Sequence, residues 1–204
     1  MTEVKAGVLA LQGDFREHGR ALADAGATPV EVRNAEQLAG VDCLVIPGGE
    51  STTIGKLARA YDLVEPVRAR VADGMPVFGT CAGMIVLARR VLGGEPLFGV
   101  MDIGVERNAY GRQVDSFETD VDVEGIEHPV RGVFIRAPRI IDIGDDVRVL
   151  AEHEGAPVVL EQGNLLVSSF HPELIGETGL HRYLLAKLGL GEGTGAQEVR
   201  RSRA

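Results

Sequence analysis

The chain has 204 residues, of which 45% are hydrophobic and 25% are charged, and its formal net charge is −9. This length allows one sizeable hydrophobic core and is short for two, and the composition is that of ordinary globular proteins. The acidic balance argues against a general nucleic-acid binder, because such a protein needs a basic face to displace phosphate counterions.

The two cysteines, Cys43 and Cys81, form neither a Cys-x-x-Cys pair nor a disulfide framework, which favours a reducing cytoplasmic location. We find no secretory signal and no apolar run near the roughly 20 residues of a membrane span, so we expect no membrane association. We predict one domain over residues 1–190. The Gly-rich segment 191–204, which carries Arg200-Arg201-Ser202-Arg203, is expected to be a disordered tail.

In the first half, apolar runs that end in glycine or proline turns alternate with amphipathic segments, which is typical of βαβ units and a parallel sheet. The expected strands are Val4–Leu11, Pro29–Val32, Val41–Ile46 and Pro76–Phe78. The expected helices are Phe15–Ala25, one that begins at Ser51 or Thr52 with Ser51 as its N-cap, Leu63–Ala72, and one that includes Met84 to Ala88.

After Leu92-Gly93-Gly94 the pattern changes to short strand-like segments separated by turn residues. These segments are Ile103–Arg107, Ser116–Val123, Val130–Ile135, Val147–Glu152, Pro157–Glu161 and Asn164–Phe170, and a helix over Thr178–Leu188 follows. We therefore predict a three-layer α/β fold. Its central sheet is mostly parallel, with flanking helices and added mixed or antiparallel strands.

Cys81 lies between a predicted strand and a predicted helix, in the sequence Gly79-Thr80-Cys81-Ala82-Gly83. A residue in such a tight strand-to-helix turn projects its side chain above the sheet, and small neighbours let a substrate approach. The helix N-terminus also favours a thiolate. This setting indicates a nucleophile, whereas Cys43 lies within an apolar strand and is most simply a core residue.

A thiolate nucleophile needs a base, and the base needs a group that orients it. His171 follows the strongest late strand and precedes Pro172, which marks the strand's end. Residues two apart on an extended segment face the same way, so Glu173 is placed to accept a hydrogen bond from His171. Of the other histidines, His18 and His128 are expected at the surface. One histidine, one cysteine and one glutamate lack the spacing of a zinc site, so we expect no metal.

The glycine loop Pro47-Gly48-Gly49-Glu50 resembles the start of a phosphate-binding loop but fails as one. Glu50 stands where that motif requires glycine, and Leu57 replaces the Ser or Thr that would bind magnesium. Two adjacent glycines after a strand suit a different role, in which backbone N–H groups face a developing oxyanion.

Together these motifs resemble the class I (triad) glutamine amidotransferases, whose fold is flavodoxin-like. More narrowly, they are similar to the glutaminase-subunit family of pyridoxal 5′-phosphate synthase, the ribose-5-phosphate-dependent route to vitamin B6. The narrower resemblance extends from about Val4 to Leu188. It rests on Leu9-Ala10-Leu11-Gln12-Gly13-Asp14, Gly48-Gly49-Glu50-Ser51-Thr52-Thr53, Glu106-Arg107-Asn108-Ala109-Tyr110-Gly111-Arg112-Gln113, Asp115-Ser116-Phe117-Glu118, Val133-Phe134-Ile135-Arg136-Ala137-Pro138 and Ser169-Phe170-His171-Pro172-Glu173.

The resemblance implies hydrolysis of L-glutamine by Cys81, His171 and Glu173, with ammonia passed to a separate synthase subunit in a heteromeric complex. It also implies substrate binding and an oxyanion hole, and no cofactor in this chain. The implied substrate-binding residues are Gly48, Gly49, Glu50, Arg107, Ile135 and Arg136, and the implied oxyanion donors are the N–H groups of Gly49 and Ala82. The surface near Gln12 and the Gly48 loop is the expected contact with the partner.

Two rival interpretations remain at this point. A cysteine peptidase or related hydrolase on the same sheet would release peptide fragments and have an open cleft. A redox-sensing protein of the same fold would oxidise Cys81 rather than acylate it, but a sensor thiol does not need the oriented base that His171 and Glu173 would supply.

Overall fold

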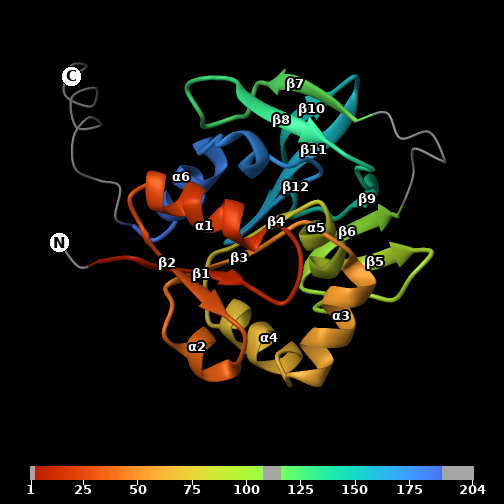
Figure 1. The fold of residues 1–204 in the computed structure, drawn as a ribbon. Helices are drawn as coiled ribbons and strands as arrows, with labels where there is room; N and C mark the ends of the chain where they lie inside the picture. The colour runs from red at the N-terminus through yellow and green to blue at the C-terminus, as the bar shows by residue number, and fades with distance from the viewer. Residues whose placement is uncertain (1–2, 108–115, 190–204) are drawn as a thin grey trace, which may run out of the picture.

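The computed structural model describes residues 3–107 and 116–189 (Figure 1). Its main sheet has seven strands in the order β10-β11-β12-β4-β3-β1-β2. Their bounds are β1 (Lys5–Leu9), β2 (Thr28–Val32), β3 (Cys43–Ile46), β4 (Val77–Thr80), β10 (Arg148–His153), β11 (Ala156–Gln162) and β12 (Leu165–Ser168). Neighbours from β12 to β2 pair in parallel, whereas β10–β11 and β11–β12 are antiparallel. This confirms the mostly parallel sheet with antiparallel additions.

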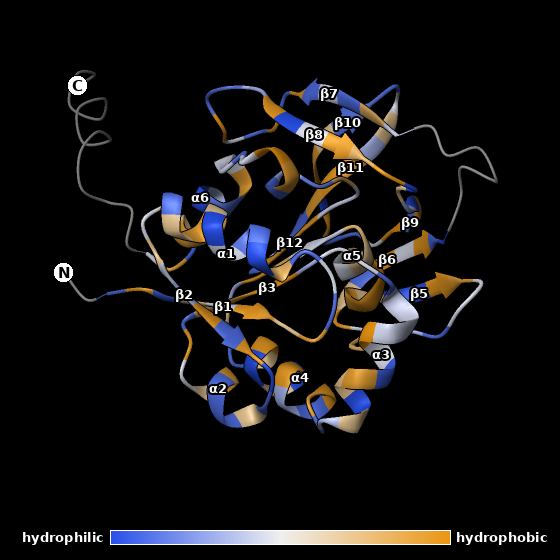
Figure 2. Cartoon of the chain, in the orientation of Figure 1, coloured by the Kyte–Doolittle hydropathy of each residue, from blue (hydrophilic) through white to orange (hydrophobic). Residues whose placement is uncertain are grey.

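Each face of the sheet has its own hydrophobic core, which gives the three layers. One core takes side chains from α2 (Ala35–Ala39), α3 (Ser51–Ala60), α4 (Val64–Ala72) and α5 (Ala82–Leu87). The other takes them from α1 (Phe15–Asp24), α6 (Gly179–Ala186) and the hairpin of β7 (Phe117–Val121) and β8 (Val130–Phe134). Figure 2 shows the sheet's apolar strands enclosed between these layers. All four residues of β3 are buried, which is why its sequence is continuously apolar.

A second sheet of three strands lies beside the first core, in the order β5 (Ala88–Leu92), β6 (Met101–Glu106) and β9 (Arg139–Ile143). Strands β5 and β6 are parallel, and β6 and β9 are antiparallel. The mixed character predicted for the second half is therefore confirmed. We expected the helix to include Ala88, but α5 ends at Leu87 and β5 begins at Ala88.

Three further details differ from the expectations. Helix α2 and strand β9 were not predicted, because α2 is only five residues long and β9 has a single buried residue, Ile140. Ser51 is not the N-cap of α3. The Glu50 carboxylate takes that role and accepts hydrogen bonds from the N–H groups of Thr52 and Thr53.

Some expectations concern residues outside the described ranges. Segment 191–204, with its arginine cluster, lies outside the described residues, as do residues 108–115 of the family motifs. Within the described ranges, no helix has the length and apolar character needed to cross a membrane.

The parallel strands bring separate parts of the sequence to one edge of the sheet. Strands β1, β3, β4 and β12 share one direction, so the segments that follow them all emerge at the same carboxyl edge. These segments carry Gln12, the Gly48 loop, Cys81 and His171. In open α/β sheets this edge is where ligands bind.

Candidate active site

Cys81 occupies a strained strand-to-helix turn between β4 and α5. Its backbone has φ 47° and ψ −101°, a conformation that residues other than glycine seldom adopt. The Cys81 N–H donates to the Ser168 carbonyl of β12 at 2.8 Å, and the Ile85 N–H donates to the Cys81 carbonyl at 3.2 Å. Two neighbouring elements thus hold the turn in place, as a nucleophile elbow requires.

Gly83 has a packing role that the sequence analysis did not anticipate. A Cβ atom at this position would lie 2.1 Å from the carbonyl oxygen of Ile46 at the end of β3. The glycine therefore lets α5 pack directly against the sheet. The small residue here serves the placement of the elbow.

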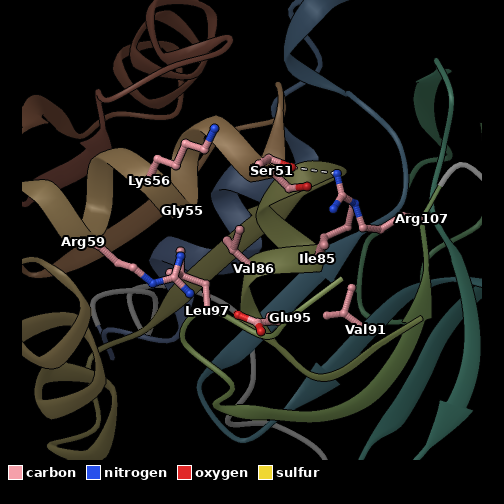
Figure 3. Close-up of a pocket in the computed structure, with 11 residues that line it drawn as sticks. Ser51, Gly55, Lys56, Arg59, Ile85, Val86, Val91, Glu95, Leu97 and Arg107 are labelled. Atoms are coloured by element: carbon pink, nitrogen blue, oxygen red, sulfur yellow. Dashed lines mark hydrogen bonds between the residues drawn. The ribbon is translucent and has the colours of Figure 1, made fainter. Parts of the chain in front are cut away.

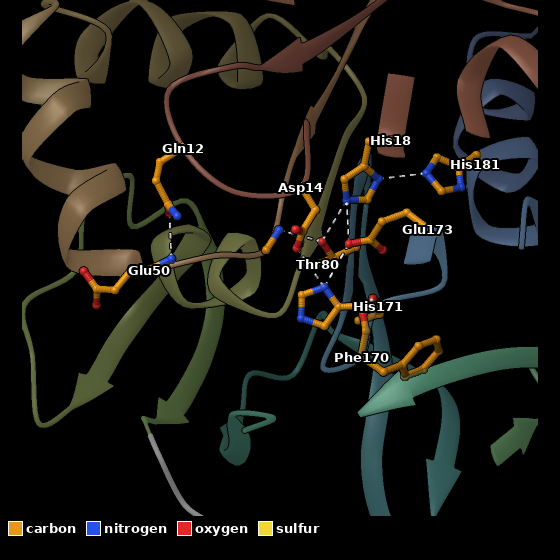
Figure 4. Close-up of polar contacts among 11 residues, drawn as sticks. Gln12, Asp14, His18, Glu50, Thr80, Phe170, His171, Glu173 and His181 are labelled. Carbon is orange, nitrogen blue, oxygen red and sulfur yellow. Dashed lines mark hydrogen bonds and ion pairs between the residues drawn. The ribbon is translucent and has the colours of Figure 1, made fainter. Parts of the chain in front are cut away.

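His171 and Glu173 form the predicted imidazole–carboxylate pair, with 2.8 Å between His171 Nδ1 and Glu173 Oε1 (Figure 4). The backbone of His171 pairs with Val133 of β8, which fixes the ring over the sheet edge. Glu173 does not sit on an extended segment as expected. It begins the short 3-10 helix η1 (Glu173–Ile175), because Pro172 already has helical backbone angles. The contact is confirmed, but the geometry assumed for it was wrong.

The charges of this pair follow from what surrounds it. Burial disfavours the charged imidazole, but hydrogen bonds with Cys81 and Glu173 outweigh it and raise the pKa of His171 to about 10. Burial also opposes ionisation of Glu173, yet the charge of His18 and hydrogen bonds from His171 and His18 lower the pKa of this carboxyl. His171 therefore holds a proton at neutral pH, between the Cys81 sulfur and an ionised carboxylate.

Cys81 and His171 line a cavity of about 290 Å³ together with most of the residues implied by the resemblance. Its lining is Asp14, Gly49, Glu50, Ser51, Cys81, Ala82, Ile85, Arg107, Ile135, Arg136, His171 and Leu174. Of the predicted residues, Gly48 and Glu173 do not line this cavity. A Cβ atom on Gly48 would lie 2.1 Å from His171 Cε1, so Gly48 lets the glycine loop and the imidazole meet.

The cavity's polar groups include residues that the sequence analysis did not assign to the site. Asp14 Oδ2 lies 3.5 Å from His171 Nδ1, and burial is the main cause that raises the pKa of this carboxyl. Asp14, His171 and Glu173 offer ligand atoms within 4.8 Å of one another. The raised pKa of His171 favours a proton over a metal ion on that ring.

A second cavity of about 250 Å³ adjoins the first and shares Ser51, Ile85 and Arg107 with it (Figure 3). Arg107 donates to Thr52 Oγ1 at 3.0 Å and to Glu50 Oε1 at 3.4 Å. These contacts hold the guanidinium against the start of α3, at the border of both cavities.

The expectation that His18 lies at the surface is wrong. His18 is fully buried on the inner face of α1, and its ring contacts Glu173, Thr80 and His181 (Figure 4). The helical spacing of His18 with the apolar Ala21 and Leu22 could have revealed this buried face. His128 is exposed as predicted, and Cys43 is a core residue as predicted.

Comparison with known proteins gives a consistent result. The model of the SNO glutamine amidotransferase family matches residues 8–189. A protein of Frankia alni called pyridoxal 5′-phosphate synthase subunit PdxT is 59% identical, over 89% of this chain and 94% of that protein. The subunit of the same name from Streptomyces coelicolor is 58% identical, over 86% of this chain and 89% of its own length.

Solved structures agree with this fold. A crystal structure described as a glutamine amidotransferase superposes with a TM-score of 0.86 at 53% identity, covering 91% of this chain and 99% of that chain. The structure of PurLQS from Thermotoga maritima shares the fold, with a TM-score of 0.70 at 18% identity over 92% of this chain and 98% of that chain. The chain belongs to the SNO glutamine amidotransferase family.

Proposed function

We propose that this chain is the glutaminase subunit of a pyridoxal 5′-phosphate synthase. It hydrolyses L-glutamine to L-glutamate and ammonia and passes the ammonia to a synthase subunit. The observation that carries the proposal is that the strained Cys81 elbow lines one cavity with His171, whose ring is hydrogen-bonded to the buried Glu173 carboxylate. The relatives named PdxT, at 58–59% identity, supply the pathway.

In this mechanism the Cys81 sulfur, whose proton is held by His171, attacks the side-chain carboxamide carbon of glutamine. His171 gives the proton to the departing nitrogen, so ammonia leaves and a γ-glutamyl thioester forms. His171 then takes a proton from water, which attacks the thioester, and keeps that proton as glutamate leaves and the Cys81 thiolate is restored. Glu173 orients the imidazole throughout.

The tetrahedral oxyanion is stabilised by the N–H groups of Gly49 and Ala82. Ala82 is the first residue of α5, and the first N–H groups of a helix have no acceptor within the helix. The N–H of Gly48 is already used, since it donates to Thr80 Oγ1 at 2.9 Å. One oxyanion donor is worth about 3–4 kcal/mol, so the conformation of the glycine loop controls the rate.

The remaining lining residues fit a free amino acid. Arg107 and Arg136 offer forked donors for the α-carboxylate of glutamine, and Ile135 gives an apolar wall. Glu50 and Asp14 are the carboxylates that face the α-ammonium group. A pocket with both charges present selects an amino acid over an internal peptide residue, which argues against the peptidase alternative.

The partner contacts the face formed by Gln12 and the Gly48 loop. The Gln12 side-chain oxygen accepts a hydrogen bond from the Glu50 N–H at 2.7 Å. A partner that displaces Gln12 would therefore also displace the glycine loop. We place the protein in the cytoplasm, because a free nucleophilic thiol persists in a reducing compartment. Residues 1–190 act as a single amidotransferase domain in this proposal.

The test is ammonia release from L-glutamine, measured with and without the synthase subunit. We expect activity from the native chain and none above background from Cys81→Ala or His171→Asn, while both variants keep the native circular dichroism spectrum. Cys43→Ala, which changes a buried cysteine outside the site, is the matched control and keeps activity. Glutamine-dependent ammonia that survives Cys81→Ala would refute the proposal.

A further inference from the structure

We propose that His18 is a positioning residue of the glutaminase site, which holds the Glu173 carboxylate and joins it to the glycine loop. This inference rests on the proposed function. It concerns a residue of α1, 153 positions before His171 in the sequence, and it assigns a role to a buried imidazole that the triad mechanism leaves unused.

The contacts of His18 form a continuous polar chain beneath the site (Figure 4). Its Nε2 lies 3.2 Å from Glu173 Oε1 and 3.0 Å from Thr80 Oγ1. Thr80, the residue before the nucleophile, accepts the Gly48 N–H at 2.9 Å. On the other side of the ring, His18 Nδ1 lies 2.9 Å from His181 Nε2 of α6. One imidazole thus connects the glycine loop, the elbow and the triad carboxylate to two helices.

The acceptors around His18 determine which of its ring nitrogens carries a hydrogen. Glu173 is 3% exposed and ionised, and a carboxylate can only accept hydrogen bonds. Nε2 of His18 must therefore carry a hydrogen, or a lone pair would face the carboxylate. Burial is the main cause that lowers the pKa of His181 to about 3, so that ring is neutral and can pair with Nδ1 of His18.

His171 and His18 both approach the same oxygen of the Glu173 carboxylate, which matters for catalysis. Oε1 of Glu173 is hydrogen-bonded to His171 and lies 3.2 Å from Nε2 of His18, while Oε2 has no hydrogen-bond partner among the described residues. If the His18 donor were lost, the carboxylate could turn and present either oxygen to His171. His18 therefore fixes the orientation of the residue that orients the base.

The same ring acts on the oxyanion loop through Thr80. Because Thr80 Oγ1 is held between His18 Nε2 and the Gly48 N–H, the glycine loop is fixed at Gly48 and its next N–H, that of Gly49, is left for the substrate. A displacement of α1 would thus move the triad carboxylate and the oxyanion loop together.

A histidine that only fills the core would behave differently from one that holds Glu173, and two substitutions separate these roles. In His18→Asn the amide matches the position of Nδ1, so the contact with His181 is kept and the donor to Glu173 is lost. In His18→Gln the amide nitrogen matches Nε2, so the donor to Glu173 is kept. Both variants disturb the packing around position 18. A difference in activity between them therefore reports on the donor to Glu173.

We expect His18→Asn to lower kcat about 10- to 100-fold, as loss of one hydrogen bond to a charged group predicts, with KM changed less than about 3-fold. His18→Gln should recover about 10-fold of that loss. His128→Asn, the same change at an exposed histidine, is the control and keeps native kinetics. Equal losses in the Asn and Gln variants, or native kcat in His18→Asn, would overturn the proposal.

A measurement on the unmodified protein covers the case in which His18→Asn does not fold. In a long-range ¹H–¹⁵N spectrum of ¹⁵N-histidine-labelled protein at neutral pH, we expect a hydrogen on Nε2 of His18. A bare Nε2 would overturn the inference. If the native complex released no ammonia from glutamine, the proposed function would fail separately, while this spectrum would still decide whether His18 donates to Glu173.

Discussion

Two imidazoles approach the same oxygen of Glu173, His171 Nδ1 at 2.8 Å and His18 Nε2 at 3.2 Å. The carboxylate is buried, so its charge is balanced by these rings rather than by water. At the scale of single residues, catalysis therefore depends on a buried negative charge whose two partners come from opposite ends of the described chain.

Glu173→Gln tests the need for that charge. The neutral amide keeps the size of the side chain but can also present its NH₂ group to His171 Nδ1, which would favour the wrong tautomer. We expect kcat for ammonia release to fall by about 10²- to 10⁴-fold with little change in KM, as loss of oriented acid–base catalysis predicts. Glu127→Gln, at an exposed position, is the control. Near-native kcat in Glu173→Gln would contradict the role of the carboxylate.

The loop between β3 and α3 is the element whose conformation matters most for the chemistry. It contacts the imidazole through Gly48, and its Glu50 carboxylate caps α3. Burial opposes ionisation of Glu50, but hydrogen bonds from Thr53 and Thr52 lower the pKa of its carboxyl. The loop is thus anchored at the helix and free of side-chain bulk where it meets His171.

Gly48→Ala should separate this close approach from stability. Its Cβ would lie 2.1 Å from His171 Cε1, so the ring or the loop must move. A displacement of about 1 Å can cost about 100-fold in rate, and we expect at least that loss of kcat. Gly40→Ala, where a Cβ would have no neighbour closer than 3.6 Å, is the matched control and should keep activity. Native kcat in Gly48→Ala would show that the loop does not need this contact.

Elements with strong local patterns were predictable from the sequence, and those set by tertiary contacts were not. The buried strand β3 and the elbow at Cys81 follow from apolar runs that end in glycine turns. The start of β5 at Ala88 was not predictable, because Ala88 fits the helical spacing and leaves it only to pair with β6. The burial of His18 was missed because a polar residue on an amphipathic helix was assigned to the polar face.

At the scale of the whole molecule, the outer strands and the last helix are joined by one partly buried carboxylate. Glu161 of β11 accepts hydrogen bonds from Tyr183 of α6, from Lys187 directly after this helix and from Arg148 of β10. Strands β10 and β11 form the end of the sheet next to β12, the strand that precedes His171. The stability of the site's scaffold therefore includes a contribution from an ion pair outside the site.

The Glu161 cluster predicts a pH dependence of stability. Burial opposes ionisation of Glu161, but hydrogen bonds from Lys187 and Tyr183 outweigh it and lower the pKa of this carboxyl in the folded protein. Between the folded value and the unfolded value near 4.5, the unfolded chain binds more protons, so this contribution is present above about pH 4.5 and is lost as pH falls. Urea titrations across this range should show the free energy of unfolding falling on acidification.

Glu161→Gln should unfold more easily at neutral pH and show a shallower dependence on acid, because it has no proton to gain. The matched control is Glu124→Gln, which removes the exposed partner of Arg148 at the surface. Exposed ion pairs contribute about 0–1 kcal/mol, so this control should keep nearly native stability and a native pH slope. If Glu161→Gln kept the full acid slope, the acid sensitivity would have to come from other carboxylates, Glu173 first among them, because its pKa is also lowered.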